Sequence, residues 1–590
     1  MRYHKSIVGS LVSLSLAALV CLTALAEAGT MPADPTVSPM RGVIDNYTQD
    51  LAGLDRRYQL PGSDAEHQRL AKFFQDRLDG LSGVNFDSLD QAGKVDYLLL
   101  QNRIRFEVRE LEYQKKQFDL VATLLPFAEP IVALEESRRR MEKLDSENAA
   151  RTLVGADSSL AKLRKDLEAK VKSNSKELPD KVLANRAAKL TDQLREVLEH
   201  WHAFYDQYDP QFSWWMREPY PKFDKALKDY AEFLRKKLAG YTDEESEPVI
   251  GDPIGRVALL DALQLDMIPY TPEELIEIAQ KEFAWCDVEM KRASRDLGFG
   301  DDWHKAVDHV AQHHVAPGDQ PQLIKQLADE AVKFVDDHDL VTIPPICRET
   351  WRMEMMSPQR QKIAPYFLGG EVIQVSYPTD TMSDQDKLMS MRGNNYAFCR
   401  ATVFHELIPG HHLQIFMSQH YNAHRHIFQT PFLIEGWALY WEMRFWDMGF
   451  ARTPEERVGM LFWRAHRCAR IIFSLKFHLG QMTAQQAIDF LVDRVGHERR
   501  NATAEVRRSV SGDYGPLYQC AYMLGALQLR ALHLEVVDAG KMKDRDFNDA
   551  VLRENAIPVE MIRASLTGQP LTRDFKSTWR FYESSAHAAN

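Results

Sequence analysis

The chain has 590 residues, of which 45% are hydrophobic and 27% are charged, and its formal net charge at pH 7 is −12. This composition is typical of a globular protein with a large core, and the length allows a catalytic unit together with an accessory helical region. The acidic balance argues against nucleic acid and anionic membranes as partners, because both repel a negatively charged surface.

The first 28 residues have the pattern of a signal peptide. A basic start precedes an apolar segment at 7–25, and small residues at 24–28 provide a cleavage site. Cys21 follows Val20 instead of a small residue, which disfavours a lipid anchor, and no later apolar run is long enough to span a bilayer. We expect an exported, periplasmic protein with no stable membrane insertion once residues 1–28 are removed.

Five cysteines lie beyond this segment. They are scattered, odd in number and without a C-x-x-C pair, which favours buried free thiols over a disulfide framework or a thiolate zinc site. These residues are Cys286, Cys347, Cys399, Cys468 and Cys520.

Residues 29–253 are predicted to form an N-terminal helical region. The stretches 93–118, 137–173 and 178–205 combine apolar residues at i, i+3 and i+4 with many charged residues, as amphipathic helices do. No fixed repeat period occurs in this region, so we do not expect a solenoid.

Residues 254–338 are predicted to form a helical connecting region. Thr271, Pro272 and Glu274 mark the start of a long helix, because Thr caps it, Pro suits its first position and Glu closes a capping box.

Residues 339–590 are expected to form the catalytic, metal-binding region. The best strand candidates, 340–345 and 365–378, lie at its beginning and are rich in β-branched residues. The predicted fold is therefore mostly α, a multi-helix body with a small β-sheet.

His405 and Glu406 form the dipeptide with which many zinc hydrolases begin a metal-binding helix. The His is a ligand, and the Glu beside it can accept a proton from water. A second His usually follows at i+4, because four residues turn about 400° and place both rings on one face. Here position i+4 is Pro409, and the next histidines are His411 and His412.

Pro409 and Gly410 are expected to break this helix. Proline has no N–H for the helical hydrogen bond, while glycine accepts the unusual backbone angles needed to resume the helix. We expect two residues to be looped out as a bulge, which returns His411 to the place of an i+4 ligand. His412 remains a rival, because periodicity alone does not separate the two histidines.

Glu435 is the candidate third ligand, 24 residues after His411. This separation allows the first helix to end, a turn near 429–431, and a second helix to pass back beside it. Glu442 then lies on the same face as Glu435 and can orient a ligand His. Two His and one Glu leave a coordination position open for water, which is the arrangement of a catalytic zinc site.

The sequence around these residues resembles a known family. HELIPGHHLQ at 405–414, followed by EGWALYWE at 435–442, is similar to the HExxPGHxxQ…EGWALYxE signature of the bacterial domain-of-unknown-function family 885. That family in turn resembles the gluzincin metallopeptidases, a largely helical group of zinc enzymes.

The resemblance implies one zinc ion held by His405, His411 and Glu435, with Glu406 as the general base. It also implies a metallopeptidase-like body with a small sheet beside a deep active-site cleft. In that arrangement Gly369–Gly370 and the strand after them form a ledge for the extended substrate.

Residues 516–525 extend the resemblance to the family's PGQALSYxxG segment. Pro516, Tyr522 and Gly525 are kept, whereas Leu517 and Tyr518 replace Gly and Gln. These departures indicate a divergent member and leave the substrate preference open.

Tyr522 is the first candidate for stabilising the oxyanion that forms on the substrate carbonyl, because a phenol can donate a hydrogen bond to it. Tyr518, His478 and Arg508 are alternatives. The guanidinium of Arg508 also suits a substrate carboxylate, and we expect Arg508 and His478 among the substrate-binding residues.

The sequence therefore predicts an exported zinc metallopeptidase that hydrolyses peptide bonds, most readily those of short peptides. Two alternatives use the same residues: a zinc hydrolase of another amide or ester, and a non-catalytic periplasmic protein that binds peptide or metal. The intact Glu406 favours an enzyme, because a pure binder does not need a general base.

Overall fold

The computed structural model describes residues 38–242, 248–361, 367–512 and 514–586, and the predicted signal peptide lies outside these ranges. Within them the chain is mostly helical with one small sheet, as the sequence predicts. None of the described helices combines the length and the apolar character that a bilayer crossing requires.

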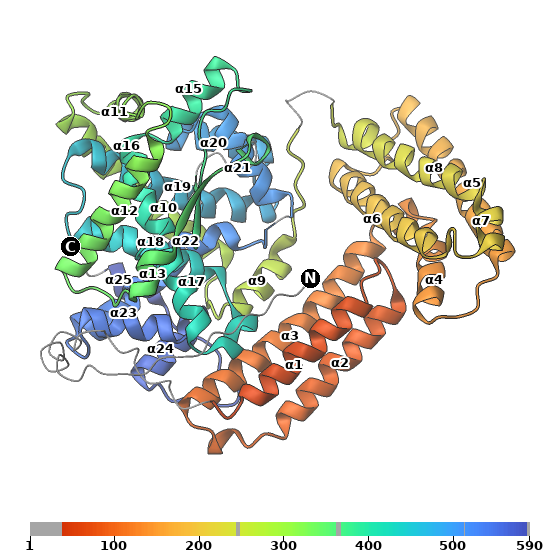
Figure 1. Cartoon of the computed structure of the whole chain (residues 1–590), viewed down its shortest axis with the longest axis horizontal. Coiled ribbons are helices and arrows are strands. Elements are labelled where there is room, and N and C mark those ends of the chain that lie inside the picture. The colour runs from red at the N-terminus through yellow and green to blue at the C-terminus, as the bar shows by residue number, and fades with distance from the viewer. Residues whose placement is uncertain (1–37, 243–247, 362–366, 513, 587–590) are drawn as a thin grey trace, which may run out of the picture.

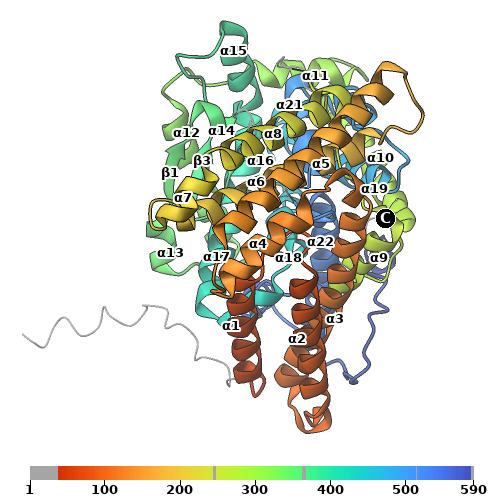
Figure 2. The same ribbon diagram turned by 90° about the vertical axis from the view of Figure 1, so that its right-hand side faces the viewer.

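The N-terminal helices form two groups, one below the main body and one set apart from it (Figure 1). The lower group, which extends below the body in Figure 2 as well, consists of α1 (Arg41–Arg57), α2 (Asp64–Ser82) and α3 (Gln91–Asp119). The other group consists of α4 (Ala128–Arg139), α5 (Ser146–Lys172), α6 (Lys181–Tyr205), α7 (Pro210–Met216), α8 (Pro219–Phe233) and the π-helical η3 (Leu234–Ala239).

These two groups belong to different hydrophobic cores. Buried side chains of α1–α3, such as Tyr97 and Ile104, are part of the same core as those of the C-terminal half. Leu60 and side chains between residues 121 and 239 form a second core around the fully buried Trp201. The packing thus joins α1–α3 to the main body and leaves α4–α8 as a separately packed unit.

The predicted helices at 93–118 and 178–205 are confirmed by α3 and α6. The prediction of one helix over 137–173 is wrong, because residues 140–145 separate α4 from α5. The Asp145 side chain accepts a hydrogen bond of 3.0 Å from a backbone N–H in the first turn of α5. Such a cap satisfies a backbone donor that a new helix leaves free, so it favours a start at this point.

The main body contains the remaining elements. Its first half consists of α9 (Gly255–Leu265), α10 (Pro272–Asp296), α11 (Trp303–Ala311), α12 (Gln320–Asp337), α13 (Pro345–Thr350), β1 (Arg352–Met355), α14 (Pro358–Gln361), β2 (Phe367–Leu368), β3 (Val372–Val375) and α15 (Asp384–Gly393). Its second half consists of α16 (Tyr396–Glu406), α17 (His411–His420), η4 (Ala423–Phe428), α18 (Pro431–Asp447), α19 (Pro454–His478), α20 (Ala484–Val495), α21 (Arg499–Val510), α22 (Tyr518–His533), η5 (Leu534–Asp538), α23 (Asp544–Arg553), α24 (Val559–Thr567) and α25 (Phe581–Ala586).

Two local predictions in the main body are confirmed. Thr271 and Glu274 form the capping box of α10, with hydrogen bonds of 3.2 Å and 2.7 Å between each side chain and the other residue's backbone N–H. The five cysteines of the described residues are free and buried.

The small sheet has β3 at its centre, parallel to β1 and antiparallel to β2. Ile373 and Val375 of β3 are fully buried and share a small core with Cys399 and Val403 of α16. The sheet is thereby fixed to the helix that carries the predicted metal ligand His405. β3 confirms the strand candidate at 365–378, of which 365 and 366 lie outside the described residues.

The other strand candidate, 340–345, is wrong. Its backbone hydrogen bonds go to side chains of α23: Asn548 Nδ2 donates to the Leu340 carbonyl at 2.9 Å, and the Thr342 N–H donates to Asp549 Oδ1 at 2.8 Å. Because side chains satisfy these backbone groups, the segment needs no partner strand.

Helix α18, which carries the predicted ligand Glu435, packs closely against α22 through two glycines. A Cβ on Gly525 would lie 1.9 Å from the Phe432 carbonyl oxygen, and one on Gly436 would lie 2.6 Å from Gly525. These separations are too short for any side chain. The backbone contact sets α22, with Tyr518 and Tyr522, directly beside the helix that carries Glu435.

We expect Gly525→Ala to lower the free energy of unfolding by about 1–3 kcal/mol, because the added methyl group forces α18 and α22 apart. Chemical denaturation of the purified protein measures this change. Gly80→Ala is the matched control, since Gly80 is exposed in α2 and has no atom near its Cβ position. An unchanged unfolding midpoint for Gly525→Ala would contradict the close packing.

Candidate metal centre

The helix predicted to bind metal is interrupted after Glu406. α16 ends at this residue, a non-helical turn follows, and α17 begins at His411. Pro409 follows a cis peptide bond, and its carbonyl accepts a 2.8 Å hydrogen bond from Trp437 Nε1 of α18. The prediction of a bulge within one continuous helix is therefore wrong. The turn at 407–410 separates two helices, α16 and α17, and a hydrogen bond from α18 holds it in place.

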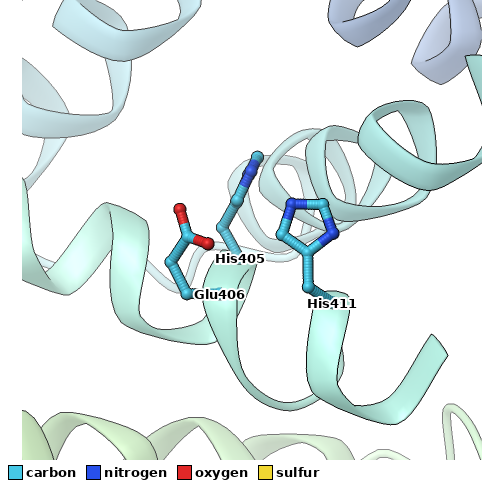
Figure 3. Close-up of side chains that lie close together, drawn as sticks. All are labelled: His405, Glu406 and His411. Carbon is cyan, nitrogen blue, oxygen red and sulfur yellow. The ribbon is translucent and has the colours of Figure 1, made fainter. Parts of the chain in front are cut away.

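Gly410 allows the turn to fold back on the end of α16. A Cβ at this position would lie 1.9 Å from the His405 carbonyl oxygen, and the Gly410 N–H donates to the Phe404 carbonyl at 3.0 Å. In a continuous helix His411 would be displaced about 9 Å along the axis from His405. Instead, the centres of the two imidazoles are 4.9 Å apart. Figure 3 shows both rings and the Glu406 carboxylate extending to one side of the turn.

Four potential ligands meet at this turn. One nitrogen or oxygen atom from each of His405, Glu406 and His411 lies within 4.8 Å of the other two. From α18, Glu435 Oε2 lies 3.2 Å from His411 Nε2 and 3.9 Å from His405 Nε2. Ligand atoms bound at about 2.0 Å to a tetrahedral zinc ion are about 3.3 Å apart, so these separations suit a single ion.

Glu435 is the carboxylate best placed to be the third ligand. Its Oε1 accepts a hydrogen bond from the Tyr518 hydroxyl, whereas its Oε2 is buried and has no hydrogen-bond partner among the described residues. His411 Nε2 lies 3.2 Å from this oxygen and forms an ion pair with it when the imidazole is protonated. A buried carboxylate oxygen without a partner is costly, and a cation would satisfy it. Two imidazoles and one carboxylate are a donor set that zinc prefers.

The electrostatics of the cluster also suit a cation. Burial tends to raise the pKa of Glu435, but the neighbouring imidazoles and the Tyr518 hydroxyl outweigh it and hold this pKa far below its usual range. Burial tends to lower the pKa of His411, and the Glu435 carboxylate raises it overall. The carboxylate is therefore ionised, and a proton and a metal ion compete for the same His411 nitrogen.

Glu442 orients His405, as the sequence predicts. His405 Nδ1 donates to Glu442 Oε1 at 2.6 Å, because a carboxylate only accepts, and this leaves Nε2 free to bind a metal. His412 points elsewhere: its Nε2 donates to the Cys347 carbonyl at 2.8 Å. The structure thus brings His411 into the cluster and keeps its rival away.

The cluster lines a cavity of about 440 Å³ between the small sheet and helices α19, α21 and α22. Gly369 packs directly on Glu406, since a Cβ there would lie 2.1 Å from Glu406 Oε2, and the Gly370 N–H donates to the Glu406 carbonyl at 3.2 Å. A larger hollow of about 580 Å³ beside Glu560 and Trp579 is more open to solvent and lies apart from the cluster.

Tyr522 lines the same cavity. Its ring is nearly parallel to that of His405, at 15°, with the ring centres 6.2 Å apart. Burial, followed by the Glu435 carboxylate, raises the pKa of Tyr522 to about 12, so the phenol keeps its proton at neutral pH and can donate it in a hydrogen bond. Tyr518 lines the cavity as well, but its hydroxyl is already bound to Glu435.

The two predicted substrate-binding residues have different positions. Arg508 lines the cavity, where its Nε lies 3.4 Å from Glu505 Oε2. His478 is buried at the far end of α19, eight residues beyond the cavity-lining Arg470, which is about 12 Å along the helix. The structure therefore does not bring His478 to the site. The prediction failed because the sequence pattern identified the helix but not the part of it that faces the cavity.

Sequence reasoning missed the role of two arginines of α19. The guanidinium carbons of Arg467 and Arg470 lie 4.7 and 4.5 Å from the centre of the Tyr522 ring, and Arg470 Nε donates to Glu505 Oε1 at 2.6 Å. The signal was available, because Arg464, Arg467 and Arg470 recur every third residue within a mostly apolar part of the helix. Buried arginines require acidic partners or a polar cavity.

Two solved structures are similar to this fold over most of the chain. A "putative lipoprotein of unknown function" from Shewanella oneidensis is 17% identical, with a TM-score of 0.65, and the match covers 89% of this chain and 98% of that one. A "putative lipoprotein" from Colwellia psychrerythraea is 16% identical, with a TM-score of 0.56, and the match covers 90% and 98%. At this identity the likeness concerns the fold alone.

No curated protein matches the sequence. The family described as "Bacterial protein of unknown function (DUF885)" matches residues 46–566, which is most of the chain. This protein therefore belongs to that family.

Proposed function

We propose that this protein is an exported, zinc-dependent metallopeptidase of gluzincin-like architecture that cleaves short peptides. The observation that carries the proposal is the convergence of His405 Nε2, His411 Nε2 and the buried Glu435 Oε2 at a cavity. Three protein ligands leave one coordination position for water, and Glu406 lies directly beside them.

Three residues would hold the metal ion, and a fourth, Glu406, transfers protons. A zinc ion bound by His405, His411 and Glu435 would lower the pKa of a water molecule and polarise the substrate carbonyl. The Glu406 carboxylate accepts a proton from this water as the water oxygen bonds to the carbonyl carbon. Glu406 then gives the proton to the amide nitrogen as the C–N bond breaks, which yields a carboxylic acid and an amine.

Tyr522 stabilises the negative charge that develops on the carbonyl oxygen. Its phenol is protonated at neutral pH, and its ring lies beside that of the ligand His405. A donor fixed in a buried site stabilises an oxyanion strongly, because the protein need not reorganise during the reaction.

The sheet provides a place for an extended peptide backbone. β2 is at an edge of the sheet, and its Phe367 and Leu368 line the cavity together with Gly369. An extended substrate can pair with such an edge by strand addition. The half-enclosed cavity favours short peptides over folded proteins. The signal-peptide pattern and the lipoprotein descriptions of the two structural neighbours support export, for which we propose the periplasm.

The metal site makes a direct prediction about two adjacent histidines. Elemental analysis of the purified wild-type protein should give about one zinc ion per chain. His411→Ala should lose this zinc, because it removes a ligand, whereas His412→Ala should keep it, because His412 is bound to the Cys347 carbonyl. Loss of zinc in His412→Ala together with retention in His411→Ala would contradict the assignment.

Glu406→Gln separates metal binding from catalysis. The amide keeps the shape of the side chain but cannot accept the proton, so we expect kcat to fall by about 10²–10⁴-fold. Zinc content should equal that of the wild type, because His405, His411 and Glu435 remain. Peptide cleavage followed by mass spectrometry measures the loss, and near wild-type turnover in a zinc-loaded variant would refute the role of Glu406.

Two tyrosine variants distinguish oxyanion stabilisation from ligand support. Tyr522→Phe should lower kcat by about 10²–10³-fold and leave zinc affinity unchanged. Tyr518→Phe removes the hydrogen bond to the ligand Glu435 and should weaken zinc binding by about 10–100-fold. Competition with a chelator measures affinity, and steady-state kinetics at saturating zinc measures kcat. If the two variants behaved alike in both assays, the separate roles would be wrong.

A further inference from the structure

We propose that the cavity holds a subsite for a carboxylate of the substrate, formed by Arg470 and Arg508. These residues, together with Arg467, are called the arginine wall below. The inference rests on the proposed function and names its substrate class: peptides with a free carboxylate close to the bond that is cleaved.

The charges in the cavity are unevenly distributed. Among the residues that the structure describes, four arginines and three glutamates line it. Two of the glutamates, Glu406 and Glu435, belong to the metal cluster. Glu505 is thus the one acidic lining residue beside the arginine wall, and a bound zinc ion would add further positive charge.

Glu505 is shared between two guanidinium groups. Its Oε1 accepts from Arg470 Nε at 2.6 Å, and its Oε2 lies 3.4 Å from Arg508 Nε. Burial tends to raise the pKa of Glu505, but Arg470 and Arg508 lower it to about 2, so Glu505 is ionised at neutral pH. The single negative charge of Glu505 is therefore paired with the positive charges of both Arg470 and Arg508.

The arginine wall retains unused hydrogen-bond donors. Arg470 is buried, with only 4% of its surface exposed. Its Nη1 nevertheless has no hydrogen-bond partner among the described residues. Nε of Arg467 is likewise buried and unpartnered. Arg470 and Arg508 both line the cavity, and a substrate carboxylate, which can accept two parallel hydrogen bonds, suits the planar donor fork of a guanidinium group.

The distance from the metal cluster fits a nearby carboxylate. The Tyr522 ring centre lies 6.2 Å from that of His405 and 4.5 Å from the Arg470 guanidinium carbon. Arg470 is therefore at most about 11 Å from the His405 ring. An extended residue spans about 3.4 Å, so a carboxylate one or two residues beyond the cleaved bond can reach the arginine wall while the carbonyl is at the metal cluster.

The carboxylate has two possible sources, the C-terminus of the peptide and an acidic side chain. Three peptides of one length distinguish them: acetyl-tetra-alanine as the free acid, the same peptide as its amide, and the amide with glutamate as the last residue. Their binding to zinc-loaded Glu406→Gln is measured by calorimetry, and their cleavage by the wild-type protein is measured by mass spectrometry.

We expect the free acid to bind at least tenfold more tightly than the neutral amide, because only the acid can pair with the arginine wall. Arg508→Gln, introduced into Glu406→Gln, should abolish this difference. Arg508→Lys should restore it only in part, because lysine keeps the charge but not the planar fork. Tight binding of the glutamate-containing amide would assign the subsite to an acidic side chain instead of the C-terminus.

Arg499→Gln is the matched control. Arg499 belongs to the same helix as Arg508 but its side chain is 58% exposed and paired with Asp489, so this variant should bind all three peptides as its parent does. Equal binding of acid, amide and glutamate-containing amide would overturn the carboxylate subsite. Binding without any cleavage by the wild-type protein would instead overturn the proposed hydrolase and leave the subsite standing.

Discussion

The site depends on one backbone contact, the approach of Gly410 to the carbonyl of His405. A side chain at Gly410 has no room there, and the contact shortens the separation of His405 and His411 to 4.9 Å between ring centres. Without it, the six-residue spacing would point the two imidazoles in different directions along one helix. The hydrogen bond from Trp437 to the Pro409 carbonyl ties this turn to α18, the same helix that supplies Glu435.

The second constraint is the glycine contact between α18 and α22. It places Tyr518 against Glu435 and Tyr522 beside His405, and these two tyrosines are only one helical turn apart. Charged side chains of α18 and α19 extend from His405 towards the cavity wall, a glutamate followed by an arginine. Glu442 links His405 to the arginine wall, since its Oε1 lies 2.6 Å from His405 Nδ1 and 3.8 Å from Arg467 Nη2. The predicted ligand His405 and the arginine wall thereby belong to one buried polar network.

The sequence predicts much of the fold and of the candidate metal cluster, because both depend on short-range patterns. Apolar periodicity located α3 and α6, and the capping box located the start of α10. The spacing of His405, His411 and Glu435 indicated a cluster that the structure brings together. The division between α4 and α5 was missed because a single capping Asp145 interrupts a continuous amphipathic pattern.

Long-range contacts account for the remaining differences. Residues 340–345 have the composition of a strand, but side chains of α23, some two hundred residues later, satisfy their backbone groups. Periodicity left His411 and His412 undecided. In the structure, the approach of His411 to Glu435 and the bond from His412 to the Cys347 carbonyl separate them. The pairing of Arg470 with Glu505 was also out of reach, because nothing local in the sequence shows that α19 and α21 meet at the cavity.

The most direct test of the central claim is peptide cleavage by the wild-type protein before and after removal of its metal. A library of short peptides is incubated with the purified, metal-stripped and zinc-reconstituted protein, and the products are identified by mass spectrometry. The account predicts that cleavage disappears with the metal and returns in proportion to added zinc, up to about one ion per chain. A protein that is fully loaded with zinc and leaves every peptide intact would contradict it.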